Sequence, residues 1–383
     1  MRVADAALAV GMDVTAVETD VERRAAIRAA GRAVPGTLEV VGSSGDGAYA
    51  ATLLCVPTRG DDGAFDPRAL LAALDEVGPH LSSRELVAIE STVPPGTTNE
   101  LLRPALQRAS GRRVGQDVFL THVPERFYAT VPEPYRAIRR IVGGVTAACT
   151  AAGVAFYREL VDEVFPVSSA MVAECAKVFE NAFRFAKVAL VNEFSIAALR
   201  LGVDPREVIA AAATKHRGFM PFWPSTGVGG HCVPASTRLL ASTIERSGIS
   251  PVLVSAMLAA DEQLPELIAL ALDLTAGMHV LLLGAGYKSG SARTTESPSL
   301  RLARHLRTSG VEVEICDVHL PSGELGERVP VRRPDEVQNR YEVAIVAAWE
   351  PEFEPVIARL KSARIVDLRG SPPARPAALI DLD

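Results

Sequence analysis

Cysteine is scarce in this sequence, and no two cysteines form a CxxC pair. The five cysteines lie far apart, at positions 55, 149, 175, 232 and 316. An odd and scattered set argues against both a disulfide framework and a structural zinc site. We therefore expect no metal site and the reduced thiols of a cytoplasmic protein.

Long apolar runs and a strong charge of one sign are also missing. No run approaches the roughly 20 apolar residues that a membrane-spanning helix needs, and no signal peptide opens the chain. The net charge of −6 gives no reason to expect binding to nucleic acid or to an acidic membrane surface. We expect neither a nucleic-acid partner nor a membrane partner.

Lysine is the third scarce residue, because only five of the 40 basic residues are Lys. A Lys ammonium differs from an Arg guanidinium in that its pKa shifts readily on burial. Some of the five lysines are therefore candidates for a chemical role. The rest of the composition, 48% hydrophobic and 22% charged over 383 residues, is that of a globular protein with two or three domains.

Strands and helices alternate over about the first 160 residues. Residues 2–12 and 66–77 have helical spacing, whereas residues 13–18, 50–57 and 86–90 are strand-like. This alternation predicts a doubly wound parallel sheet.

The predicted elements are all helices in the middle of the chain, and strands and helices alternate again near its end. Helical patterns cover 168–201 and 204–213, a glycine- and proline-rich loop covers 216–236, and further helices run to about 274. We therefore predict an α/β fold with two Rossmann-like doubly wound domains joined by a central all-helical domain. The predicted domains are an NAD-binding domain over 1–165, a helical domain with the cysteine loop over 166–275, and a nucleotide-sugar-binding domain over 276–383. Later strands are expected at 279–286, 311–317, 341–347 and 363–368.

Glu18 closes a strand that resembles the second strand of a dinucleotide-binding unit. An acid there can accept hydrogen bonds from a ribose diol, which favours NAD over NADP. The strand and the GxGxxG turn that should come before this unit are missing from the sequence. Two explanations stay open: Met1 lies inside a longer reading frame, or the chain is shortened and binds NAD poorly.

Cys232 lies in the segment Gly227-Val-Gly-Gly-His-Cys-Val-Pro234. Glycines let a ligand come close to the backbone, and the thiolate of a free cysteine is a strong nucleophile. We therefore expect Cys232 to act as a nucleophile. The other four cysteines, in apolar strand or helix patterns, are expected to be buried and structural.

Lys177 and Asn181 are four residues apart in the long helical pattern and so share one face. Their neighbours on that face are apolar, which favours an interior Lys and Asn. A buried ammonium can stabilise a developing alkoxide. An ordinary surface pair between Glu174 and Lys177 is the alternative, and the helix by itself does not decide between the two.

At these residues the chain resembles the UDP-glucose/GDP-mannose dehydrogenase family. It is most similar to the branch that acts on UDP-N-acetylglucosamine and UDP-N-acetylmannosamine. The resemblance covers nearly the whole chain. The matching segments are Cys55–Thr58, Glu90–Thr98, Pro124–Arg126, Arg140–Gly144, Lys177, Asn181, Asn192–Glu193, the Cys232 loop, Gly286–Lys288 and Glu296–Pro298.

The resemblance implies a four-electron oxidation of a sugar CH₂OH to a carboxylate with two NAD⁺, through a thiohemiacetal and a thioester on Cys232. The implied catalytic residues are Cys232, Lys177, Asn181, Glu125 and Thr92. The implied NAD-binding residues are Glu18, Pro57, Thr58 and Thr92. The implied UDP-sugar-binding residues are Phe219, Gly229, Gly230 and Lys288, and we expect Arg293 to supply a further cation for the same substrate.

Three positions depart from the family pattern. Ser236 replaces an Asp four residues after the cysteine, and Arg293 and Thr295 replace an Asp and an Arg in the third domain. With the missing glycine turn, these changes keep open a catalytically silent subunit that only binds nucleotide-sugar or a partner. A hydroxyacid dehydrogenase of the 6-phosphogluconate type is a weaker alternative, because it does not explain Cys232 or the third domain. The helical middle also predicts a homodimer.

Overall fold

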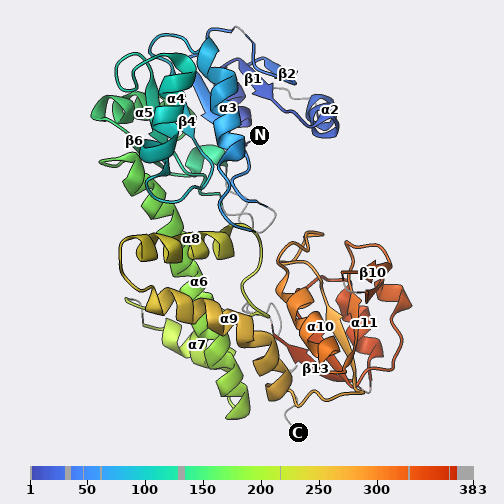
Figure 1. The fold of residues 1–383 in the computed structure, drawn as a ribbon. Helices are drawn as coiled ribbons and strands as arrows, with labels where there is room; N and C mark the ends of the chain where they lie inside the picture. Colours follow the sequence, from blue (N-terminus) through green and yellow to red (C-terminus); the bar gives the residue numbers. More distant parts are fainter. Residues whose placement is uncertain are drawn as a thin grey trace. The chain divides into compact units, whose positions relative to one another are not determined.

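The computed structural model describes residues 2–30, 36–45, 47–60, 63–127, 134–215, 217–326, 328–361 and 363–368. The chain divides into two compact units, residues 1–180 and 181–383, which are described separately (Figure 1). The boundary falls within the long helix α6 (Ala170–Arg200). No described helix is both long enough and apolar enough to cross a membrane.

Unit 1 contains two sheets. A parallel pair, β1 and β2, forms one sheet, and the other has the strand order β3-β4-β5-β6-β7. The strands are β1 (Val14–Val17), β2 (Leu38–Val41), β3 (Ala51–Leu54), β4 (Leu86–Ile89), β5 (Phe119–His122), β6 (Arg140–Gly144) and β7 (Val164–Pro166). The helices are α1 (Arg2–Ala9), α2 (Val21–Ala29), α3 (Arg68–Val77), α4 (Arg103–Ser110) and α5 (Ala147–Leu160), with a short π-helical turn, η2 (Thr98–Leu102).

Helices cover both faces of the five-stranded sheet. All four residues of β4 are buried, as expected for a strand with helices on both sides. Leu70 and Leu74 of α3 lie in one hydrophobic cluster of this sheet, and Tyr157 and Leu160 of α5 lie in another. The predicted α/β layering is therefore confirmed in unit 1.

Two details of unit 1 differ from the prediction. β6 runs antiparallel to β5, so the sheet is not wholly parallel; an antiparallel neighbour does not need the crossover helix that a parallel one requires. The helix expected from Asp66 begins at Arg68, and the Asp66 carboxylate accepts a hydrogen bond from the Arg68 N–H at 2.9 Å at this end of the helix.

Unit 2 begins with helices. After α6 come α7 (Pro205–Ala213), α8 (Cys232–Arg246) and α9 (Val252–Ala271). The loop expected over 216–236 ends at His231, because Cys232 is already the first residue of α8. Pro234 is compatible with this early start, since the first turn of a helix does not need its backbone N–H.

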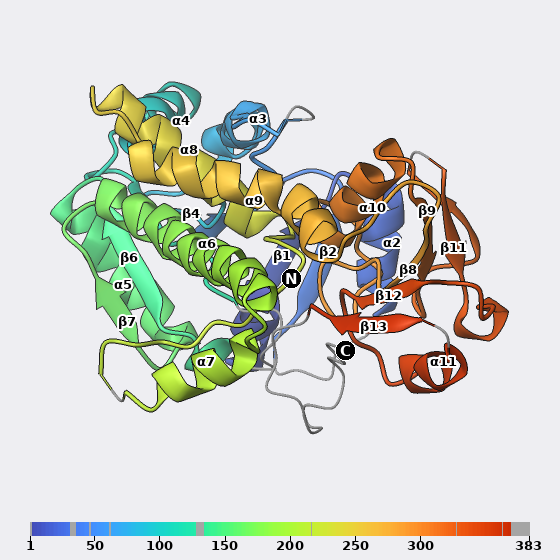
Figure 2. The same cartoon turned by 90° about the horizontal axis from the view of Figure 1, so that it is seen from below.

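The second half of unit 2 is a six-stranded sheet in the order β10-β11-β9-β8-β12-β13. Its pairs are parallel except β10 with β11. The helices α10 and α11 lie on opposite faces of this sheet (Figure 2). The elements are β8 (His279–Leu283), α10 (Pro298–Thr308), β9 (Glu312–Cys316), β10 (Gly323–Leu325), β11 (Val329–Arg332), β12 (Val343–Val346), α11 (Phe353–Arg359) and β13 (Arg364–Asp367).

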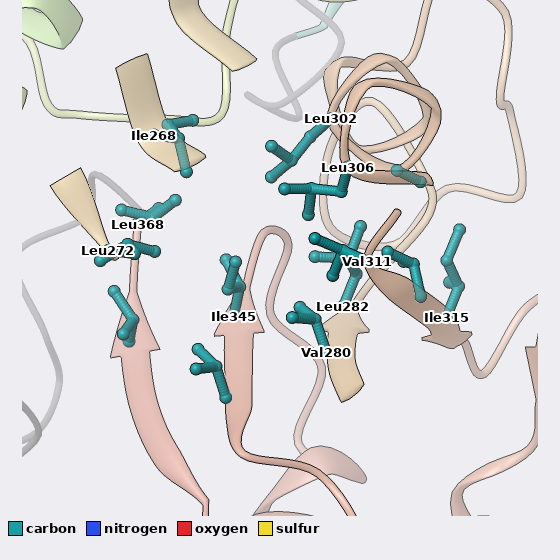
Figure 3. Close-up of a cluster of buried hydrophobic side chains, with 14 of the residues drawn as sticks. Ile268, Leu272, Val280, Leu282, Leu302, Leu306, Val311, Ile315, Ile345 and Leu368 are labelled. Atoms are coloured by element: carbon teal, nitrogen blue, oxygen red, sulfur yellow. The ribbon is translucent and has the colours of Figure 1, made fainter. Parts of the chain in front are cut away.

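One hydrophobic core joins α9 to this sheet. Ile268 of α9 and Leu272, which directly follows α9, pack in the same cluster as Leu282 of β8 and as Leu302 and Leu306 of α10 (Figure 3). Truncating a buried Leu or Ile in such a core to Ala costs about 2–5 kcal/mol. The segments predicted as the helical and nucleotide-sugar-binding domains therefore share a core within unit 2.

Candidate active site

The predicted NAD-binding residues of unit 1 lie just beyond the carboxyl ends of its strands. Thr58 follows β3, and its hydroxyl donates to the backbone oxygen of Thr92, beyond β4, at 2.8 Å. Pro57 directly precedes Thr58. The structure thus brings these three residues together at the edge where open α/β sheets bind ligands.

Glu18 follows β1, and its backbone N–H donates to the Val41 oxygen at 3.0 Å. Its carboxylate accepts from the Asp20 N–H at 3.1 Å and lies 3.4 Å from the guanidinium of Arg23. Arg23 is largely exposed, and exposed ion pairs contribute little stability. The carboxylate therefore lies at a strand end, where an acid that holds a ribose diol is expected.

Glu125 is held by an arginine that the sequence analysis had not assigned a role. Arg140 is completely buried. Its two terminal nitrogens donate to the two carboxylate oxygens of Glu125 at 3.1 and 3.0 Å, and one of them also donates to the Pro124 oxygen at 3.1 Å. Such a bidentate pair fixes both the position and the orientation of a carboxylate.

A buried carboxylate, Glu90, lies in the same unit. The hydroxyl of Tyr157 donates to Glu90 at 2.6 Å, and burial raises the pKa of Glu90. Cys55 is exposed as a residue, but its thiol lies 3.7 Å from the other Glu90 oxygen. Burial of the sulfur and then the charge of Glu90 raise the pKa of the Cys55 thiol.

The expectation of four buried structural cysteines is half right. Cys149 and Cys316 are buried, whereas Cys55 and Cys175 are exposed residues. Cys55 follows the last residue of β3, where the chain leaves the sheet. Cys175 lies on the exposed side of α6, so an apolar sequence pattern did not place it inside.

Glu174 does not form the surface pair that was the alternative for this helix. It is completely buried, and its carboxylate accepts from the Gly96 and Thr98 N–H groups at 2.6 and 2.7 Å. These donors precede and open η2, so Glu174 caps that turn. Burial raises the pKa of Glu174. Lys177 is 8% exposed, so of the two alternatives that the sequence left open the structure has the interior one.

His122 at the end of β5 is a residue that the sequence analysis missed. Its side chain is completely buried, and neither ring nitrogen has a hydrogen-bond partner among the described residues. Burial, and then the positive charge of Lys177, lower the pKa of His122 to about 3. The imidazole is therefore neutral near pH 7.

Asn181, Cys232 and Ser236 lie together in unit 2. The amide nitrogen of Asn181, which is 8% exposed, donates to the Ser236 hydroxyl at 2.8 Å and to the backbone oxygen of Cys232 at 3.5 Å. Cys232 is exposed and opens α8. The positive end of the helix dipole therefore lies beside the residue expected to become a thiolate.

The glycines before Cys232 are in contact with the predicted substrate segment. A Cβ on Gly229 would lie 2.5 Å from Pro298, and one on Gly230 would lie 2.9 Å from the Tyr287 ring. Gly230 also has φ +80°, which L side chains rarely adopt. The loop backbone packs against residues 287–298, and this contact requires glycine.

The other residues predicted to bind substrate, Lys288, Arg293 and Phe219, lack the tight packing seen at Gly229 and Gly230. The Lys288 ammonium lies 5.6 Å from the centre of the Tyr287 ring. Arg293 is exposed, and its backbone oxygen accepts from the Tyr287 N–H at 3.2 Å. Phe219 is 39% exposed on the loop before α8.

Across the described part of the chain, no cluster of His, Cys, Asp and Glu is arranged to hold a metal ion.

Models of all three domains of one enzyme family match this chain. The NAD-binding domain of the UDP-glucose/GDP-mannose dehydrogenase family matches residues 43–161, the central domain matches 171–263, and the UDP-binding domain matches 281–371.

Individual relatives agree with these matches. The UDP-N-acetyl-D-mannosamine dehydrogenase of Pyrococcus horikoshii is 31% identical over 79% of this chain and 72% of its own length. The UDP-N-acetyl-D-glucosamine 6-dehydrogenase of Pseudomonas aeruginosa is 29% identical over 79% of this chain and 74% of its own. A solved structure of the UDP-D-ManNAc dehydrogenase from P. horikoshii has a TM-score of 0.82 at 26% identity, over 99% of this chain and 94% of that one. The chain therefore belongs to the UDP-glucose/GDP-mannose dehydrogenase family and is an NAD-dependent oxidoreductase.

Proposed function

We propose that this enzyme oxidises the C6 alcohol of a UDP-sugar to a uronic acid, with Cys232 as the covalent nucleophile. The observation that carries the proposal is the placement of Cys232, exposed at the start of α8 with the Asn181 amide beside it. The match of residues 281–371 to a UDP-binding domain supports a UDP-sugar as substrate. The relatives named for UDP-N-acetylhexosamines make that sugar class the first to test.

Cys232 keeps the sugar bound between two oxidations. The first oxidation removes a hydride from C6 and a proton from its hydroxyl, which leaves an aldehyde. The Cys232 sulfur adds to the aldehyde carbon and forms a thiohemiacetal. Loss of a second hydride and a proton gives a thioester, and water then releases the carboxylate and the thiol. The oxidising power would come from two NAD⁺ molecules, one for each stage, each of which would take up a single hydride and leave as NADH.

Polar side chains on α6 and at the strand ends assist these steps. The Lys177 ammonium stabilises negative charge on the C6 oxygen, which buried cations do effectively. The Asn181 amide holds that oxygen or a water, and Glu125 and Thr92 are assigned to catalysis on their match to the family pattern. Glu18, Pro57, Thr58 and Thr92 hold NAD, and their placement at strand ends fits a dinucleotide. Phe219, Gly229, Gly230, Lys288 and Arg293 hold the UDP-sugar.

The departures from the family pattern do not favour a silent subunit. Ser236 stands where the family has Asp, yet its hydroxyl accepts the Asn181 amide at 2.8 Å, so the buried amide is not left without a partner. Arg293 is exposed, so its extra charge has no burial cost. Both observations support an active enzyme.

The reaction is tested by counting NADH. The protein is mixed with NAD⁺ and, separately, with UDP-N-acetylglucosamine, UDP-N-acetylmannosamine and UDP-glucose. We expect two NADH for each sugar consumed with at least one substrate, and no free aldehyde. Absence of NAD⁺ reduction with all three sugars would instead support the silent subunit.

We also propose that the enzyme is a homodimer that pairs through α6. Along the part of α6 in unit 2 and at the residue that follows it, apolar residues recur at helical spacing and remain exposed: Phe183, Leu190 and Phe194 of α6 are 50%, 68% and 39% exposed, and Leu201 just after the helix is 78% exposed. An exposed apolar stripe of this kind marks an interaction surface. A second copy of the chain would bury it.

A further inference from the structure

A buried aspartate on α9 connects two segments of unit 2. Asp261 is 4% exposed. One of its carboxylate oxygens accepts from the backbone N–H of Val228 at 2.7 Å, and the other accepts from Arg301 of α10, also at 2.7 Å. A single carboxylate thus holds the loop before Cys232 and the helix that follows the predicted substrate segment.

The loop backbone lies directly against this ion pair. Gly227 has φ +134°, and a Cβ there would lie 2.6 Å from an Arg301 terminal nitrogen and 3.2 Å from the Asp261 oxygen. A side chain at this position would therefore have to displace the end of Arg301 from its place beside Asp261. Glycine is favoured here by its backbone conformation as well.

Val228 fixes the same loop through its side chain. It is buried in a small cluster with Phe185 and Ala189 of α6. The loop is therefore held at its backbone by Asp261 and at its side chain by α6, four residues before Cys232. Pro298, one turn before Arg301 on α10, touches Gly229, so both sides of the loop contact α10.

We infer that Asp261 and Arg301 are positioning residues that set the geometry of the Cys232 loop, an inference that rests on the proposed role of Cys232. Catalysis by a nucleophile on a loop depends on its placement, and a displacement of about 1 Å can cost about a hundredfold in rate. Without the carboxylate, the Val228 N–H and the Arg301 guanidinium would both lose a buried partner.

Position 261 needs a carboxylate, because the Val228 N–H and the Arg301 guanidinium both donate hydrogen bonds to it. An amide of the same shape offers one acceptor and one donor. In Asp261→Asn, the side chain accepts from Val228 or from Arg301, and its NH₂ group faces the other donor. Replacing Arg301 by Gln in the same protein removes that conflict, because the Gln oxygen accepts from the Asn NH₂.

The test compares Asp261→Asn, Arg301→Gln, the double variant, and Glu266→Gln as the matched control on the exposed side of α9. Turnover number and KM for the sugar nucleotide are measured. The rate at which iodoacetamide alkylates Cys232 is followed by peptide mass spectrometry, and folding is checked by circular dichroism.

We expect Asp261→Asn to lower turnover about ten- to a hundredfold and to change the alkylation rate of Cys232. The double variant should recover part of both, and Glu266→Gln should match the wild type. A folded Asp261→Asn protein with turnover and alkylation within twofold of wild type would overturn the inference. A double variant whose loss of turnover equals the product of the losses in the two single variants would overturn it as well. If a Cys232→Ala protein makes acid, the proposed function fails. The alkylation rate of Cys232 would still show whether Asp261 and Arg301 set the geometry of the loop, because alkylation does not depend on turnover.

Discussion

Several polar side chains of unit 1 are buried, and each has a different energetic consequence. Arg140 has its charge compensated by Glu125 at 3.0 Å, although the Glu125 side chain itself is 37% exposed. Glu174 is compensated by two backbone N–H groups. His122 lacks such compensation from described residues and is therefore held in its neutral form.

His122 should make the protein less stable in mild acid. The unfolded chain binds a proton on this imidazole below its ordinary pKa of 6.5, whereas the folded chain does so only near 3. Stability is therefore present above 6.5 and is lost as the pH falls toward 3, by up to about 1.4 kcal/mol for each pH unit. In urea titrations from pH 5 to 8, wild type should lose stability relative to His122→Gln as the pH falls. Parallel pH curves for the two proteins would contradict this, and His80→Gln at an exposed position is the control.

Sequence spacing predicts some of these residues and not others. For Lys177 and Asn181 the helical period offered an interior placement on an apolar face, but it left a surface pair with Glu174 as an equal alternative. Arg140 and Glu125 are 15 residues apart, and Asp261 and Arg301 are 40 apart. No local period relates such positions, so only the folded chain brings these partners together.

At the scale of elements, the start of α8 and the loop before it position the proposed nucleophile. Gly230 packs on Tyr287 with a positive φ. Sequence reasoning identified the glycines but extended the loop to residue 236, because Pro234 and Gly230 both suggest irregular backbone. The helix begins at Cys232 instead.

Gly230→Ala should damage both the fold and the activity. A non-glycine residue held in this conformation costs about 1–3 kcal/mol, and its Cβ would lie 2.9 Å from the Tyr287 ring. Gly248→Ala is the matched control, because Gly248 has φ +81° but nothing within 4 Å of the added atom. We expect both variants to lose unfolding free energy and only Gly230→Ala to lose turnover as well. Equal turnover in the two variants would show that the Tyr287 contact is unimportant.

At the scale of the whole molecule, the exposed side of α6 is the feature that a single chain does not explain. Burying a Leu side chain contributes about 1.5–3 kcal/mol. In a symmetric dimer each of these residues occurs once in each chain, so both copies would be buried. The proposed homodimer accounts for the otherwise unfavourable exposure of four apolar side chains in unit 2.

Leu190→Glu should therefore dissociate the protein. Sedimentation equilibrium at micromolar concentration should give a dimer for wild type and a monomer for the variant, because an unpaired charge would be buried at the interface. Glu245→Lys, on the exposed end of α8, should leave the mass unchanged. A wild-type monomer, or a Leu190→Glu dimer, would contradict the proposal.

Much of the overall architecture could be predicted from the sequence. The change from period two to period 3.6 and back located the α/β, helical and α/β parts. The antiparallel β6 and the core shared by α9 and β8 could not be predicted. Strand direction depends on how the chain returns to the sheet, and an apolar helix face looks the same whichever neighbour it packs against.

The central claim concerns Cys232 and is tested most directly by product analysis of Cys232→Ala. The variant is incubated with NAD⁺ and the best UDP-sugar, and the uronic acid is measured by mass spectrometry beside a nucleotide-sugar binding assay. We expect binding to be retained and acid formation to be abolished, because no thioester can form without the sulfur. Acid production by Cys232→Ala at the wild-type rate would contradict the account.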